Sequence, residues 1–209
     1  MLQGNYDAAL KQLQGAKTSG ASPAEVENLR GLALLLDGKS ADAITAFNRA
    51  LELQANLEAA RFNRGIAFLR ARDYAKTIAD LERVYGDEHS ALRADAAYHL
   101  GIAYDRAGRT ADAEASLERA LKLDATLDAA LLYIGTLRER RGDLQGAGRA
   151  FLDCLAAHPQ SVTAMLRFGM SAHKAGRTDV AKSYLQKVIA AAPASPEGLE
   201  ARKFLVMWE

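Results

Sequence analysis

Glycine recurs along this chain at nearly constant intervals, and this period is the strongest constraint on its fold. One glycine column has spacings of 34, 36, 34 and 34 residues: Gly31, Gly65, Gly101, Gly135 and Gly169. A second column follows seven residues later, with Arg72 in place of a glycine in the second unit: Gly38, Gly108, Gly142 and Gly176. A fixed period of this length indicates structural units that stack on their neighbours.

Apolar residues between the glycines follow helical spacing. In the third unit Ala97, Leu100, Gly101 and Tyr104 lie on one helical face, and a second such run begins at Ala113. The second glycine column falls between the two runs, where glycine accepts the left-handed conformation that ends many helices. Each unit is therefore predicted to be a helical hairpin.

Three further columns hold in phase over the units: Ala43, Ala113, Ala147 and Ala181; Phe47, Leu81, Leu117, Phe151 and Leu185; Ala50, Val84, Ala120, Cys154 and Val188. With these columns the chain resembles the tetratricopeptide repeat (TPR) family, whose unit of about 34 residues is a pair of helices with small residues at their contact. Pro159 and Pro193 match the closing proline of that family, whereas Ala55, His89 and Ala125 depart from it. The resemblance implies an all-α, right-handed superhelical solenoid of antiparallel helix pairs, with about 12 helices.

We expect one repeat domain over residues 1–209, made of a half repeat, five full repeats and a capping helix: 1–23, 24–57, 58–91, 94–127, 128–161, 162–195 and 196–209. Leu92 and Arg93 lengthen one connection, and Thr77 replaces the usual alanine. Gly146 and Gly148 lie inside a predicted helix, and we favour a close helix contact over a hinge as their explanation.

The two ends of the chain differ from the repeats between them. Near the start, four residues match the second helix of a repeat whose first helix is missing: Tyr6, Ala9, Leu13 and Ala16. We favour truncation within a repeat over a native cap, so the compartment stays undetermined between bacterial cytoplasm and periplasm. Ser22, Pro23 and Glu25 predict a capping box at the next helix.

The last helix should close the stack, because Lys203 occupies the glycine column and prevents close docking of another helix. Its apolar face is predicted from four residues: Leu199, Phe204, Leu205 and Trp208. Repeat arrays need such a terminal helix to cover the last stacking face.

Composition and motifs argue against several classes of function. The 27 basic and 26 acidic residues nearly cancel, which disfavours nucleic acid as a partner, and no apolar run is long enough for direct membrane insertion. The single cysteine, Cys154, falls in a core column, and four histidines lack metal-ligand spacing: His89, His99, His158 and His173. No enzyme motif is present, so we expect no catalytic residue, metal site or cofactor.

In the TPR family the first helices of successive repeats line a concave groove, and the resemblance assigns this groove residue by residue. The expected partner-binding residues are Asn28, Leu32, Leu35, Phe62, Ile66, Leu69, Arg70, Tyr98, Ile102, Arg106, Leu132, Arg140, Leu166, Met170 and Lys174. The first half of the groove should be apolar and the second half polar, with a ladder of basic residues. The asparagines and lysines with which some TPR proteins grip a carboxyl terminus are mostly absent, which disfavours that ligand.

The leading hypothesis is an adaptor that binds an apolar or amphipathic segment of another protein in this groove. Assembly of a bacterial envelope complex, such as a pilus or its secretin pore, is one setting that the repeat count suggests. The alternatives are a self-associating structural module, including a weak homodimer, and a regulatory domain of a larger, catalytic protein.

Overall fold

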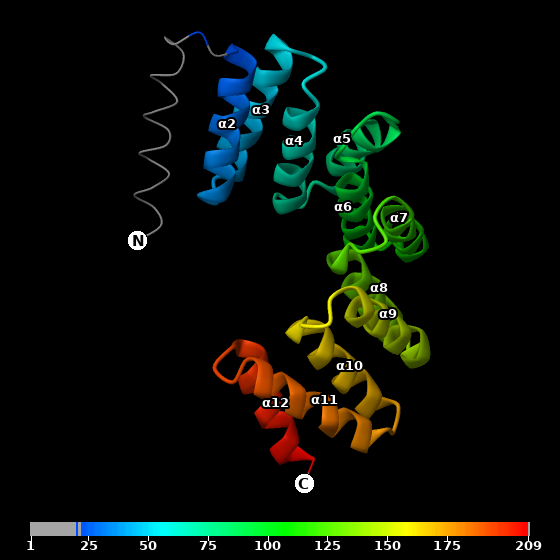
Figure 1. The fold of residues 1–209 in the computed structure, drawn as a ribbon. Helices are drawn as coiled ribbons and strands as arrows, with labels where there is room; N and C mark the ends of the chain where they lie inside the picture. Colours follow the sequence, from blue (N-terminus) through cyan, green and yellow to red (C-terminus); the bar gives the residue numbers. More distant parts are fainter. Residues whose placement is uncertain (1–19, 21, 209) are drawn as a thin grey trace. The chain divides into compact units, whose positions relative to one another are not determined.

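The computed structural model of the chain describes residue 20 and residues 22–208. These residues form eleven helices and no strand (Figure 1). The predicted all-α class is therefore confirmed. A further helix, expected on Tyr6, Ala9, Leu13 and Ala16, lies outside the described residues.

Residue contacts divide the chain into two compact units, residues 1–116 and 117–209. The helices described in unit 1 are α2 (Pro23–Leu36), α3 (Ser40–Leu53), α4 (Glu58–Arg70), α5 (Tyr74–Gly86) and α6 (Arg93–Arg106). Helix α7 (Thr110–Leu123) crosses the boundary. Unit 2 continues with α8 (Asp128–Arg140), α9 (Leu144–Ala157), α10 (Val162–Lys174), α11 (Thr178–Ala191) and α12 (Pro196–Met207). Consecutive helices pack on each other from α2 to α6 and from α8 to α12.

The turn inside a hairpin is closed by a pair of backbone hydrogen bonds. After α4, the Asp73 N–H donates to Phe68 O at 2.9 Å and the Arg72 N–H donates to Leu69 O at 3.1 Å. This Schellman pattern needs a left-handed residue, and the second glycine column supplies it with φ of 76–82° at Gly38, Gly108, Gly142 and Gly176. The predicted role of that column is confirmed.

Arg72 is the exception, with a φ of 62°. Among the described residues it is the single non-glycine residue with positive φ. A side chain in the left-handed conformation costs roughly 1–2 kcal/mol, because Cβ approaches a carbonyl oxygen. The second hairpin therefore keeps its turn geometry at the expense of backbone strain.

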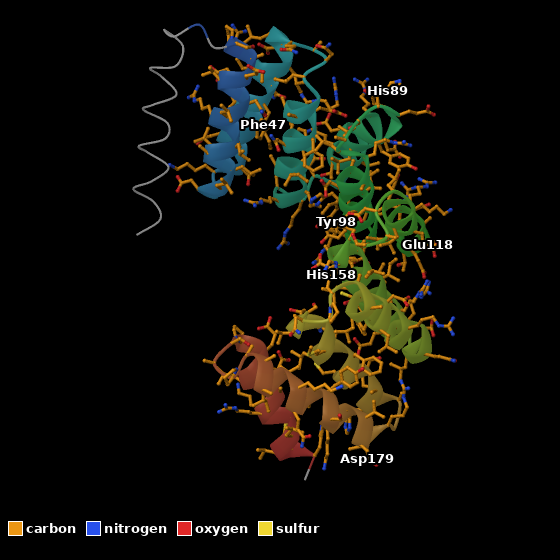
Figure 2. All side chains as sticks on the ribbon, in the orientation of Figure 1. Phe47, His89, Tyr98, Glu118, His158 and Asp179 are labelled. Atoms are coloured by element: carbon orange, nitrogen blue, oxygen red, sulfur yellow. The ribbon has the colours of Figure 1, made fainter. Side chains whose placement is uncertain are left out.

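In unit 1 a large side chain of the second helix packs on the glycine of the first. A Cβ added to Gly31 would lie 2.5 Å from Phe47 Cε1, and one added to Gly65 would lie 2.8 Å from Leu81 Cδ2. Phe47 and Leu81 are fully buried, and Figure 2 marks Phe47 on α3. A hydrophobic cluster surrounds Phe47 and contains Leu34, Leu35, Ala43, Ala46 and Ala67, with Ile44 and Ile66 packed against it.

One buried charge is built into the core of unit 1. The Asp80 carboxylate is only 5% exposed and accepts two hydrogen bonds from the Arg64 guanidinium, each of 2.7 Å. Arg64 also donates to Asn48 Oδ1 at 2.7 Å. This arrangement joins α3, α4 and α5, and the bidentate geometry compensates part of the cost of burying the carboxylate.

Unit 2 repeats the glycine contact. A Cβ added to Gly135 would lie 2.7 Å from Phe151 Cδ1, and one added to Gly169 would lie 3.2 Å from Leu185 Cδ2. Cys154 is fully buried in a neighbouring cluster with Leu131 and Ala164. This burial fits the predicted place of the thiol in a core column.

Helix α12 packs on α10 and α11, with Ala201 fully buried. Phe204, Leu205 and Trp208 contact the same cluster, as the sequence predicts. The prediction is wrong for Leu199, which is 51% exposed. Leu199 lies on the outward face with Met207, where both line a shallow hollow.

Two further local predictions need correction. Ser22 precedes α2 as its N-cap residue, but its side chain makes no capping hydrogen bond, so the predicted capping box is absent. Gly146 and Gly148 are not explained by a close helix contact. The Asp143 carboxylate that caps α9 occupies the space of a Cβ on Gly146, and a Cβ on Gly148 would meet Phe168 and Arg177 at an ordinary 3.6 Å.

Gly135 and Gly148 provide a matched stability test within unit 2. We expect Gly135→Ala to lower the free energy of unfolding by about 1–3 kcal/mol, because the new methyl group overlaps the Phe151 ring. Gly148→Ala should raise it by up to about 1 kcal/mol, because the methyl group fits and alanine is the better helix former. Urea denaturation followed by circular dichroism measures both. Equal effects of the two substitutions would contradict the packing of Gly135 against Phe151.

Candidate functional site

The first helices of unit 1 carry a series of partly exposed apolar side chains. Helix α4 packs against both α2 and α6, so the three helices are neighbours in sequence order. The predicted groove residues on them that remain partly exposed include five that lie away from the helix ends and are apolar or aromatic: Leu32, Phe62, Ile66, Tyr98 and Ile102. The glycine contacts occupy another face of these helices, since Gly31 and Gly65 point to α3 and α5. We call these five residues the apolar face of unit 1.

Aromatic rings connect α4 and α6 within this face. The ring of His99 lies edge-on to Phe62, with centroids 5.8 Å apart, and 4.9 Å from the ring of Tyr98. Figure 2 marks Tyr98 on α6. The edge-to-face contact favours a fixed arrangement of the Phe62 and His99 rings. Phe62 and Tyr98 therefore both contact the ring of His99.

His99 itself is largely buried in this aromatic group. Burial lowers the pKa of its imidazole below the ordinary value, and the nearby Asp95 carboxylate opposes that shift to a smaller extent. Its Nδ1 atom is buried without a hydrogen-bond partner. Both observations favour the neutral ring at neutral pH.

Asn28 is held by a hydrogen bond between neighbouring repeats. Its side-chain oxygen accepts from Asn63 Nδ2 at 3.0 Å, which links α2 to α4. Asn28 is partly exposed and keeps its own amide N–H groups as donors.

Leu35 and Leu166 do not fit the predicted groove. Leu35 is 3% exposed and belongs to the cluster around Phe47, while Leu166 is 4% exposed in the cluster that α12 covers. Both lie where a neighbouring helix packs on the first helix, so neither side chain is available to a ligand. Ile66 is intermediate, because it is partly exposed and also packs against the Phe47 cluster.

The apolar candidates of unit 2 mainly serve its core. Leu132 packs against the clusters of Cys154 and Phe151, and Met170 packs against the cluster of Leu185. Lys174 donates to the Glu139 carboxylate at 2.6 Å, and Arg140 is exposed. Unit 1 therefore carries more of the partly exposed apolar candidates than unit 2.

The basic candidates of unit 1 differ in their contacts. Arg70 Nη1 donates to Leu35 O, the backbone carbonyl near the end of α2, at 2.6 Å. Arg106 is exposed and its side chain makes no hydrogen bond or ion pair with the described part of the chain. Leu69 is partly exposed and lies in one hollow with both arginines.

Two lining residues of that hollow are missing from the predicted groove, Arg72 and Tyr74. The sequence contains a signal for Arg72, because the second unit is the one in which a charged residue replaces glycine in the second glycine column. The column pattern alone indicates only that this residue replaces glycine in a turn. Tyr74 begins α5, a second helix, and groove columns counted on first helices do not include it.

Other chemistry finds little support in the described residues. They contain no group of three or more side chains arranged to hold a metal ion. Burial raises the pKa of the Cys154 thiol, which disfavours the reactive thiolate. Within the same part of the chain, each helix is too short or too polar to cross a membrane.

Sequence models of a known family match most of the chain. The model described as tetratricopeptide repeat matches residues 62–128, 98–162 and 133–196, and one described as tetratricopeptide repeat-like domain matches residues 1–64. No curated protein sequence matches the chain.

Solved structures share the fold at low sequence identity. The type IV pilus biogenesis factor PilW is 20% identical, with a TM-score of 0.83, and the match covers 95% of this chain and 92% of that protein. PilF of Pseudomonas aeruginosa is 18% identical, with a TM-score of 0.77 and coverages of 97% and 91%. YrrB, described as a TPR protein with an unusual peptide-binding site, is 21% identical, with a TM-score of 0.63 and coverages of 91% and 97%. The likeness extends over nearly the full length of each protein.

The burial of His99 predicts a pH-dependent stability. Because the pKa of His99 is lowered in the folded chain, the unfolded chain takes up a proton at this residue more readily than the folded chain. The free energy of unfolding should therefore fall as the pH drops through the ordinary histidine pKa of about 6.5. One proton accounts for at most about 1.4 kcal/mol per pH unit. Urea denaturation at about pH 7.5 and about pH 5.5 should show a smaller loss for His99→Leu than for the wild type.

His89→Leu is the control, because His89 is exposed in the α5–α6 connection. It should lose as much stability as the wild type between the two pH values. If His99→Leu behaves in the same way, then the proton is taken up elsewhere.

Proposed function

Since the chain belongs to the tetratricopeptide repeat family, we propose that it is a protein-interaction scaffold that carries out no catalysis of its own. The observation that carries the proposal is the apolar face of unit 1, five partly exposed side chains on three successive first helices. Contiguous exposed apolar area usually marks an interaction site. The ligand that fits it is an apolar or amphipathic segment of another protein.

The physical argument rests on how the face is built. Phe62 and Tyr98 are positioned by contacts with His99, so little side-chain entropy remains to be lost on binding. Leu32 lies on α2 and Ile102 on α6, and both side chains are partly exposed. A ligand side chain that contacts them would bury further apolar surface, and each Å² removed from water contributes about 25 cal/mol to the binding free energy.

The fold relatives support this class of function and suggest a setting. PilW and PilF are similar over nearly their whole length, and PilW is described as a type IV pilus biogenesis factor. YrrB is described as having a peptide-binding site. We propose assembly of a bacterial envelope complex, such as a pilus or its secretin, as the process in which the scaffold acts.

Substitution at Ile102 tests the proposed face. Peptides selected from a displayed random library on the wild-type protein should carry apolar residues, and Ile102→Asp should weaken their binding by about tenfold or more. The reason is that the new carboxylate would lose hydration against the apolar ligand. Fluorescence anisotropy with the selected peptide measures the dissociation constant.

Leu53→Asp is the matched control, because Leu53 is a 44% exposed leucine of α3 in the same unit. It should leave binding unchanged, and circular dichroism should show that both variants keep the wild-type helix content. Ile102→Ser provides a milder change if the aspartate lowers the melting temperature. If both Ile102 variants bind the peptide as tightly as the wild type, then the apolar face is not the ligand site. If the wild type forms dimers that the Ile102 variants do not form, then the face serves self-association.

A further inference from the structure

A hollow of about 430 Å³ lies beside the apolar face of unit 1 and is lined mainly by cations. Its lining residues come from the end of α4, the start of α5 and the end of α6: Leu69, Arg70, Arg72, Tyr74, Ile102 and Arg106. No acidic side chain is among them. Its volume exceeds that of several water molecules, so it has room for a carboxylate and an apolar side chain together.

Arg72 is the least expected member of this group. The equivalent turn position holds glycine at Gly38, Gly108, Gly142 and Gly176, whereas Arg72 keeps a side chain at a φ of 62°. Its side chain is exposed and makes no hydrogen bond or ion pair with the described residues. Backbone strain that brings no packing in return is a sign of a functional position.

The positive charge of the hollow is not neutralised from within. Arg106 also has no ionic partner in the described part of the chain. Asp73, next to Arg72 in sequence, pairs with Lys76 at 2.8 Å and accepts the Lys76 N–H as the cap of α5. Arg70 uses one N–H for Leu35 O and keeps further donors.

We propose that Arg70, Arg72 and Arg106, with the Tyr74 hydroxyl, bind the carboxylate of an acidic side chain in the partner segment. Ile102 belongs both to this hollow and to the apolar face, so one extended peptide can place an acidic residue here and apolar residues beside it. Arginine suits this ligand, because its planar guanidinium donates to both carboxylate oxygens. The inference rests on the proposed peptide-binding function and specifies its ligand as acidic and apolar.

A protein ligand fits this charge better than a nucleic acid. The whole chain has a net charge of +1, so no extended positive field attracts a phosphate backbone. The cations are confined to one hollow whose walls include Leu69 and Ile102. An isolated anion site with apolar walls favours a single carboxylate next to an apolar side chain.

Two synthetic peptides test the proposal, one of alternating glutamate and leucine and one of alternating glutamine and leucine. In fluorescence anisotropy at low salt, the wild type should bind the glutamate peptide roughly five- to thirtyfold more tightly, and salt should reduce this preference. Arg72→Gly combined with Arg106→Gln should remove the preference and leave the affinity for the glutamine peptide unchanged. The melting temperature of Arg72→Gly should equal or exceed that of the wild type, since glycine relieves the strain.

Arg83→Gln is the matched control, because Arg83 is an exposed arginine of α5 that lines a different hollow. It should retain the glutamate preference. A preference that survives the double substitution, or a wild type without any preference, would overturn the carboxylate site. Competition by inorganic phosphate or by a single-stranded oligonucleotide that matches the glutamate peptide would reassign the hollow to a phosphate ligand.

These results separate the inference from the proposed function. If Leu32→Asp, a change in the apolar face outside the hollow, abolishes binding of both peptides while the arginine substitutions act on both alike, then the apolar face stands and the carboxylate site fails. If the arginine substitutions remove the preference for glutamate but Leu32→Asp has no effect, then the anion site stands and the apolar face fails.

Discussion

The close contact between a glycine backbone and a large apolar side chain is the constraint on which four hairpins depend: α2–α3, α4–α5, α8–α9 and α10–α11. It recurs at a separation of sixteen residues, as in Gly31 with Phe47 and Gly135 with Phe151. The absent Cβ lets the second helix bring its largest side chain onto the first helix, and that side chain becomes fully buried. Because dense packing tolerates neither a void nor an added methyl group, this contact determines which face of the first helix turns inward.

That orientation has a consequence for function. Once the glycine side of α4 faces α5, the side that carries Phe62 and Ile66 turns toward the neighbouring repeats and solvent. Stacking uses part of this second side, as the contact of Ile66 with the Phe47 cluster shows. The surface that we propose for ligand binding is therefore the part of the first helices that packing between repeats leaves exposed. It includes the rings of Phe62 and Tyr98, which contact His99.

The sequence predicted the contacts within a repeat far better than those between repeats. Phe47 and Leu81 could be assigned from their columns, because a helical hairpin places the same positions in contact in every unit. Leu35 and Leu166 could not be assigned in this way. Their burial depends on how a following helix lies across them, and that geometry is set by rotation between helices and not by the residue's own column.

The same limit explains the turn and the last helix. Ser22 has the residue type of a capping box, but its side chain makes no capping hydrogen bond in the structure. Leu199 shares a helical pattern with Phe204, yet it remains exposed where α12 packs on α10 and α11. Patterns identify which residues share a face approximately. Tertiary packing decides the edge of that face.

The basic column shows how one sequence pattern can have several physical outcomes. Lys174 pairs with Glu139, and Arg70 binds the backbone carbonyl of Leu35, one repeat earlier in each case. Arg106 makes no side-chain hydrogen bond or ion pair with the described residues, and the connection before α6 is lengthened by Leu92 and Arg93. The column therefore links neighbouring repeats at Arg70 and Lys174, but not at Arg106 within the described part of the chain.

Arg72 adds to this a charge that the fold does not require. A glycine would satisfy the turn without strain, as it does at Gly38 and Gly108. A sequence that specifies one structure normally agrees with local preference at every level, and departures that bring no packing gain concentrate at functional positions. Here the departure places a guanidinium in one hollow with Arg106, which has no ionic partner among the described residues, at the border of the apolar face. The strain and these charges occur in the same hollow, and the proposed acidic ligand would account for both.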